Sequence, residues 1–98
     1  MLFMFRGEPK PGMSEEEQKR ALQVFRGWKP PAGMTVKAHY LGVSGGDYVI
    51  VEADSVEVMI EAVANWAPFV NYTADPIVEV TQGVGALDRA VSARAAIV

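Results

Sequence analysis

The clearest local signal in the chain is HYLGVSGGDYVIVE, residues 39–52. β-Branched and aromatic side chains predict strands over 34–43 and 47–53, and SGGD at 44–47 between them is typical of a hairpin turn. A loop of Gly45-Gly46, or of all four residues 44–47, sets a register in which His39 faces Glu52. Their Cβ atoms would then lie about 5 Å apart, within reach of a hydrogen bond. A loop of Ser44-Gly45 alone would place Ile50 opposite His39 instead.

The residues before the hairpin predict one strand and one helix. An apolar run over 1–6 indicates a first strand. Ser14 followed by Glu17 is a capping box, which opens a helix at about residue 14. The helix ends near Gly27, because the Lys29-Pro30-Pro31 segment cannot continue it.

The residues after the hairpin repeat this order. Asp54 and Glu57 have the capping pattern for a helix over about 55–65, whose polar residues form one narrow ribbon: Glu57, Glu61 and Asn65. The rest of that helix is apolar and requires cover from another element or subunit. A last strand is predicted over 72–81, where Pro76 favours an edge position, and a weakly amphipathic helix over 86–96 docks as a lid or crosses to a partner.

The predicted order is strand, helix, strand, strand, helix, strand, which is the ferredoxin-like pattern of an α+β protein with an antiparallel sheet. We expect one domain over 1–98, with a core over 1–81 and a helical extension over 82–98. Alternation assigns one face of the sheet to the helices: Leu2, Met4, Val36, Ala38, Tyr40, Val49, Val51, Val78 and Val80. The other face mixes large apolar and ionisable groups: Phe3, Phe5, Lys37, His39, Leu41, Tyr48, Ile50, Glu52, Ile77 and Glu79. Such a mixed face is expected to pack against a second copy of itself.

Composition narrows the classes of function. The 98 residues carry a net charge of −3 and nine scattered Lys and Arg, so the basic patch that nucleic-acid binding needs is missing. No cysteine and one histidine argue against a metal site, and no cofactor is predicted. The apolar start MLFMF is too short for a signal peptide or a membrane span, so we expect a cytoplasmic protein without a membrane partner.

Three stretches resemble a known family: WKPPAG at 28–33, HYLGVSGGDYVIVEAD at 39–54 and NWAPFVNYTADPIVEV at 65–80. They are similar to a bacterial family of small domains of unknown function, in the dimeric α/β-barrel group, over about residues 1–81. The resemblance implies ferredoxin-like subunits that pack their open sheet faces into a homodimer. The group includes cofactor-independent monooxygenases that hold a polycyclic phenol among Asn, Trp, Tyr and His side chains. This chain offers residues of these types: Asn65, Trp66, Tyr72, Tyr48 and His39. No motif matches residue by residue, and no catalytic role is transferred.

The His39–Glu52 pair has two interpretations. It could be a general base oriented by a carboxylate, or a structural polar pair at the rim of a dimer barrel. A cavity for a small apolar or aromatic ligand would be lined by Phe3, Phe5, His39, Leu41, Tyr48, Ile50, Glu52 and Trp66.

Three functions remain open on the sequence alone. The first is a homodimeric barrel that binds a small apolar or aromatic molecule. The second is a non-catalytic structural or sensory homodimer with a filled barrel. The third is an enzyme similar to the cofactor-independent monooxygenases.

Overall fold

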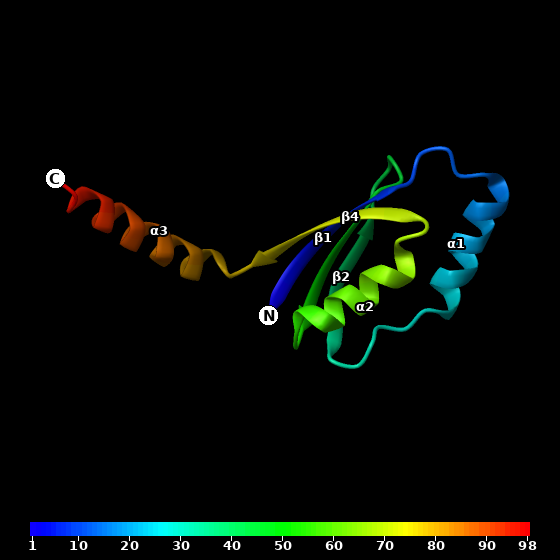
Figure 1. Ribbon diagram of the computed structural model, residues 1–98, viewed down its shortest axis with the longest axis horizontal. Helices are drawn as coiled ribbons and strands as arrows, with labels where there is room; N and C mark the ends of the chain where they lie inside the picture. Colours follow the sequence, from blue (N-terminus) through cyan, green and yellow to red (C-terminus); the bar gives the residue numbers. More distant parts are fainter.

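The computed structural model describes residues 1–98 and confirms an α+β fold, with one antiparallel sheet of four strands and three helices (Figure 1). The elements follow in the order β1 (Leu2–Pro9), α1 (Glu15–Gly27), β2 (Met34–Leu41), β3 (Asp47–Ala53), α2 (Val56–Trp66), β4 (Val70–Ile77) and α3 (Val80–Ala95). The strand order across the sheet is β2-β3-β1-β4, with β4 at an edge. This arrangement is compatible with the ferredoxin-like fold. None of the three helices has both the length and the apolar character needed to cross a bilayer.

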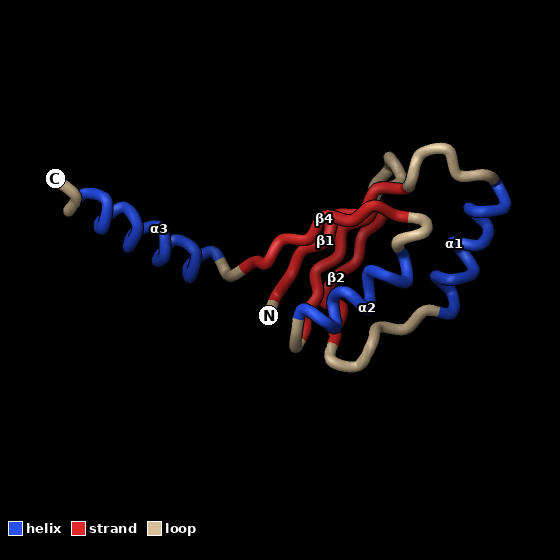
Figure 2. Tube along the Cα trace, in the orientation of Figure 1, coloured by secondary structure: helices blue, strands red, loops and turns tan.

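Helix α1 starts at the predicted capping box, whereas α2 is capped by Ser55 and not by the predicted Asp54. At α1, the Ser14 hydroxyl accepts from the Glu17 amide at 3.0 Å, and the Glu17 carboxylate accepts from the Ser14 amide at 3.2 Å. At α2, the Ser55 hydroxyl accepts from the Val58 amide at 3.3 Å. Helices α1 and α2 lie on the same side of the sheet (Figure 2). The predicted bounds of these two helices are therefore correct to within about a residue.

The hairpin register differs from the prediction. The loop is Val43-Ser44-Gly45, closed by a hydrogen bond from the Gly42 amide to the Gly46 carbonyl and by Gly45 at φ 91°. A three-residue loop with a left-handed glycine is the second common hairpin type, and it shifts the pairing. His39 consequently faces Val49, and Glu52 faces Thr35. The predicted His39–Glu52 pair is wrong.

The face assignment also needs correction. An irregularity between Val36 and Ala38 leaves Lys37 without a partner and reverses the faces of the residues that follow it in β2. His39 and Leu41 therefore join Val36 on the helix side, whereas Ala38 and Tyr40 lie on the open side. The assignment for β1 was inverted, because MLFMF is apolar on both faces and has no period: Phe3 and Phe5 are buried beneath α2, and Leu2 and Met4 face outward.

The last strand begins and ends earlier than predicted. It stops at Ile77, and α3 already begins at Val80, so Val78 and Val80 are not sheet residues. The predicted helix over 86–96 thus begins six residues earlier and includes Gly83 and Gly85. Alternation over Val78-Glu79-Val80 was mistaken for a strand, although Val80 also begins a series with Val84, Leu87 and Val91 at helical spacing.

The buried core is small. It consists of Phe3, Phe5, Val51, Ala53, Met59 and Ala62, which join β1 and β3 to α2. Neither α1 nor α3 contributes a buried residue. Helix α3 extends away from the sheet (Figure 1) and gives the chain a radius of gyration of 17.5 Å, against roughly 13 Å for a compact chain of this length.

Candidate functional site

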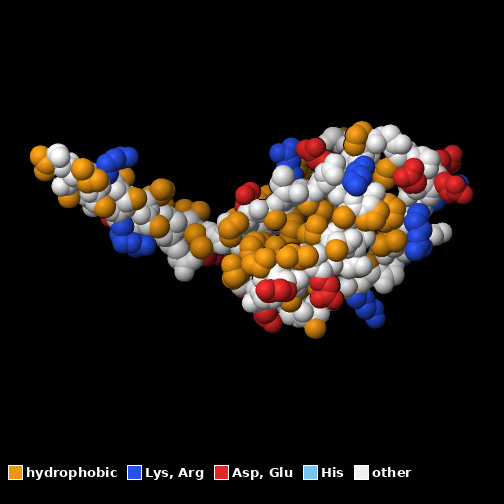
Figure 3. Space-filling view, viewed as in Figure 1, with side chains coloured by type: hydrophobic (Ala, Val, Ile, Leu, Met, Phe, Trp, Pro, Cys, Tyr) orange, Lys and Arg blue, Asp and Glu red, His pale blue; other side chains and the backbone are white.

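A cavity of about 560 Å³ separates α1 from the sheet, within the usual range for small-molecule sites. Fifteen of its eighteen lining residues are apolar, and the exceptions are His39, Gly45 and Asp47. The floor comes from the sheet and the walls come from α1 and α2. Apolar side chains also gather on the surface over α2 and the neighbouring sheet (Figure 3).

The cavity exists because α1 packs only loosely. Leu22 and Phe25 lie on the apolar stripe of α1 and line the cavity, yet each is 55% exposed. Segments containing Pro9 and Pro11 on one side and Pro30 and Pro31 on the other connect α1 to the strands. The helix is thus tethered at both ends without closing onto the sheet.

Four aromatic rings link α1 to the rest of the domain. The Trp28 and Trp66 ring centroids lie 5.8 Å apart with the planes at 69°, and Phe25 lies 6.1 Å from Trp66. Phe25 also approaches the His39 ring at 6.2 Å. Edge-to-face contacts of this kind stabilise a pair by about 0.5 to 1.5 kcal/mol beyond area burial. The rings form one continuous wall from the end of α1 to β2.

The polar groups of the cavity meet at Asp47. Its Oδ2 accepts a hydrogen bond from His39 Nε2 at 2.9 Å and a long one from the Tyr72 hydroxyl at 3.5 Å. The Asp47 side chain is only 16% exposed, against 39% for His39. Because a carboxylate only accepts, Nε2 carries the hydrogen of this contact, and Nδ1 is the ring nitrogen without a hydrogen-bond partner.

Tyr72 is held in its neutral form. Burial chiefly, and then the negative charge and the hydrogen bond of Asp47, raise the pKa of the Tyr72 phenol well above its ordinary value. The ring packs edge-on against Phe5, with centroids 5.8 Å apart. At neutral pH this side chain is therefore a hydrogen-bond donor and not an anion.

Gly7 makes room for this cluster. It is buried in β1, opposite Asp47 of β3 and Tyr72 of β4. A Cβ at this position would collide with the Asp47 carboxylate and the Tyr72 ring. A glycine inside a strand often marks such a close approach, so the central strand lets side chains of its two neighbours meet above it.

The structure divides the predicted ligand-binding residues into two groups. Phe5, His39, Leu41 and Trp66 line the cavity, and Phe3 lines a smaller groove beside α2. The other three predicted residues lie on the opposite face of the sheet, where they pair with Leu2, Met4 and Arg6 of β1: Tyr48, Ile50 and Glu52.

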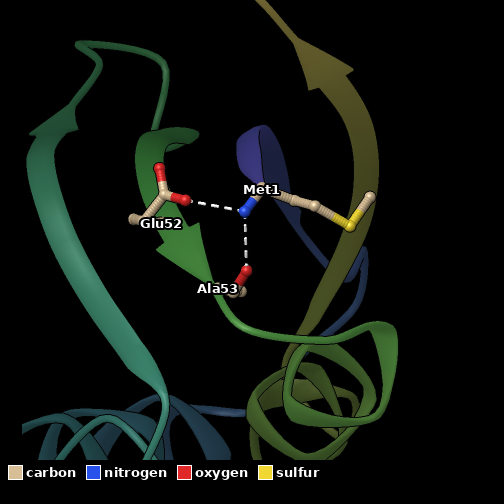
Figure 4. A network of polar contacts seen from close by, with 3 residues as sticks. All are labelled: Met1, Glu52 and Ala53. Atoms are coloured by element: carbon tan, nitrogen blue, oxygen red, sulfur yellow. Dashed lines mark hydrogen bonds and ion pairs between the residues drawn. The ribbon is translucent and has the colours of Figure 1, made fainter.

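Glu52 has a different partner from the one expected. Its Oε1 accepts a hydrogen bond from the Met1 amino group at 2.6 Å, and the same amino group donates to the Ala53 carbonyl at 2.9 Å (Figure 4). Glu52 thus fastens the start of β1 to the end of β3. It takes no part in the cavity.

Sequence reasoning missed Asp47 and Tyr72 as site residues. Asp47 was interpreted as a turn residue, and Tyr72 was named only among the residues of the types found in the monooxygenases. A signal for both was available in Gly7, which interrupts an apolar strand where a neighbouring side chain must pass. No group of three or more His, Asp or Glu side chains lies close enough together to hold a metal ion.

The fold and the cavity define a small α+β domain of ferredoxin-like appearance with an apolar pocket under a loosely packed helix. A family model described as a domain of unknown function (DUF3303) matches residues 1–91, and the chain belongs to this family. The match continues past residue 81 and includes most of α3. No curated protein matches the chain.

Proposed function

We propose that the protein binds a small apolar or aromatic molecule that carries one polar group, in the cavity between α1 and the sheet. The observation that supports this proposal is the distribution of polarity. A largely apolar cavity of about 560 Å³ has its ionisable side chains clustered around a single carboxylate, Asp47. Ligand sites in proteins commonly combine apolar walls with a few convergent polar groups.

The polar cluster gives the ligand an orientation. The free Nδ1 of His39 accepts a hydrogen bond from a hydroxyl of the ligand, while Asp47 holds the ring in place. The aromatic wall contacts the rest of the molecule, through Phe25 and Trp66 in particular. A flat aromatic ring with one hydroxyl group could both donate to His39 and pack against the aromatic wall.

A second part of the proposal is a homodimer that forms an α/β barrel through the open sheet face. This face has no helix, and it carries Tyr40, 68% exposed, beside Tyr48 and Met4, each 38% exposed. Native mass spectrometry of the full chain tests it directly, and Tyr40→Asp should shift the dimer toward monomer. A monomer at all concentrations would remove the dimer from the proposal but leave the cavity in place.

Tryptophan fluorescence reports on the cavity. The chain has two tryptophans, Trp28 and Trp66, and both line the cavity. Anilinonaphthalene sulfonate bound there should accept energy from them, and 2-naphthol should displace the dye more strongly than naphthalene does. A hydrogen bond of about 1.4 kcal/mol corresponds to a tenfold preference.

Two variants distinguish binding in the cavity from binding on the open face of the sheet. His39→Ala should abolish the preference for 2-naphthol over naphthalene, and Tyr48→Phe on the open face should leave the preference unchanged. If the dye is not excited by energy transfer, or if both variants behave alike, the cavity is not the binding site. The filled, non-catalytic homodimer would then be the better interpretation.

A further inference from the structure

Helix α3 carries an apolar stripe without cover. Val80, Val84, Leu87 and Val91 recur at steps of four, three and four residues, which places them on one side of the helix. Each is at least half exposed, with Leu87 at 67%. The family match ends at residue 91, so it includes the whole stripe.

The helix is weak when it stands alone. It has 16 residues and contains Gly83 and Gly85, each of which costs about 1 kcal/mol relative to alanine. Its N-cap residue, Glu79, makes no capping hydrogen bond, unlike Ser14 and Ser55 at the other helices. Isolated helices of this length are marginal in water, so α3 requires a surface to pack against.

A groove of suitable character lies beside α2, on the side of β4. It has a volume of about 400 Å³, and all eight lining residues are apolar. Val56 and Ile60 of α2 form one wall and are 53% and 63% exposed. Ala64 and Ala74 are small and leave space, while Phe3 and Phe5 form the floor. An apolar helix laid over the edge strand would cover this groove beside α2.

The charges next to the two surfaces are opposite in part, because Arg94 and also Asp88 lie beside the stripe of α3. Glu57 and Glu61 follow Val56 and Ile60 by one residue each on α2, and both lack an ion-pair partner within the chain. Arg94 lies beside the apolar stripe of α3 and is also unpaired. If α3 fills the groove, its Arg94 can approach Glu57 and Glu61 of α2.

The connection to α3 directs the helix away from its own groove. Asp54-Ser55 reverses the chain between β3 and α2 with a bend and a serine cap. Val78-Glu79 has the same length but no turn residue, and Glu79 makes no capping hydrogen bond. The chain continues beyond the sheet, and α3 lies away from its own groove (Figure 1).

We propose that α3 is an exchanged arm that docks its apolar stripe into the groove between α2 and β4 of a second copy of this chain. A reciprocal exchange closes with twofold symmetry and covers the exposed stripe and groove of both copies. The contact uses neither the cavity nor the open sheet face, so disulfide trapping between α3 and the groove distinguishes it from the proposed open-face dimer and from ligand binding in the cavity.

The absence of cysteine allows a direct test by disulfide trapping. One full-length chain carries Leu87→Cys, in the middle of the stripe, and a second carries Ile60→Cys, in the middle of the groove. Mixing the two under mild oxidation should give a covalent heterodimer as the main product, because disulfides form only when the two Cα atoms approach within about 7 Å. As a control, Ala86→Cys on the far side of α3 should give at least severalfold less.

The double variant Ile60→Cys/Leu87→Cys distinguishes exchange from self-closure. Exchange gives a covalent dimer. A covalent monomer would mean that α3 folds back onto its own groove and would overturn the proposal. If the main product joins position 87 of one chain to position 87 of another, α3 pairs with a second α3 instead of the groove. Equal yields for Leu87→Cys and Ala86→Cys with Ile60→Cys would show that no specific contact exists.

Discussion

Helices α1 and α2 cover the same face of one sheet, yet they pack in different ways. Met59 and Ala62 of α2 are buried against β1 and β3, whereas α1 has no buried residue and stands over a cavity. Both helices have capped N-termini, so local helix signals do not explain the difference. The distinction lies in what each apolar stripe touches. Helix α2 contributes to the buried core, whereas α1 only forms a wall of the cavity.

Truncating one residue on each helix should give the largest contrast. Met59→Ala removes a side chain that is 6% exposed and should lower the free energy of unfolding by about 2 to 5 kcal/mol, as for other core truncations. Leu22→Ala on α1 should cost less than about 1 kcal/mol, because this side chain is already half in water. Urea denaturation of both variants measures the difference, and equal costs would mean that α1 packs as closely as α2.

A matched pair of glycine substitutions should give a smaller contrast. Gly7→Ala forces Asp47 and Tyr72 apart and should destabilise the fold by about 1 to 3 kcal/mol, with weaker dye binding in the cavity. Gly27→Ala meets no atom within 4 Å and should stabilise α1 by up to about 1 kcal/mol. Thermal unfolding of the two variants should show shifts of opposite sign. A tolerated Gly7→Ala would contradict the close approach at Asp47.

The smallest expected effect concerns alkaline stability. Folding raises the pKa of Tyr72, so the neutral phenol is favoured in the native state. The stabilisation is complete below the unfolded pKa of about 10 and is lost as the pH rises from there toward the folded value. Tyr72→Phe should therefore lose less stability than the wild type between about pH 9 and 11. Urea midpoints across this range measure it, with Tyr40→Phe as an exposed control that should follow the wild type.

The predictions that depended on local chemistry were close to the structure. The capping patterns located the starts of α1 and α2 to within one residue, although Ser55 and not Asp54 caps α2, and the order of elements led to the antiparallel α+β arrangement. The hairpin was found, but its register depended on which residues of the GVSGG stretch form the loop. Two-residue and four-residue loops were considered, and the loop has three residues closed by a left-handed Gly45.

The candidate site was predicted only in part, for a related reason. Phe5, His39, Leu41 and Trp66 line one cavity, but it lies on the helix side of the sheet, whereas the prediction placed Phe5, His39 and Leu41 on the open face. The residue opposite His39 depends on the hairpin register and on the unpaired Lys37. Neither feature can be predicted from the types of residue in the strands. The raised pKa of Tyr72 depends on burial, which requires the fold to be known.

The unpaired residue in β2 has a consequence for how the length of this strand can vary. Cross-strand pairing places His39 on the cavity side and Ala38 on the open side, because His39 pairs with Val49 and Ala38 with Ile50. Deletion of Lys37 would place Ala38 directly after Val36 in a regular ladder, with both residues on their present faces. The strand can therefore lose this residue without changing which of its side chains line the cavity.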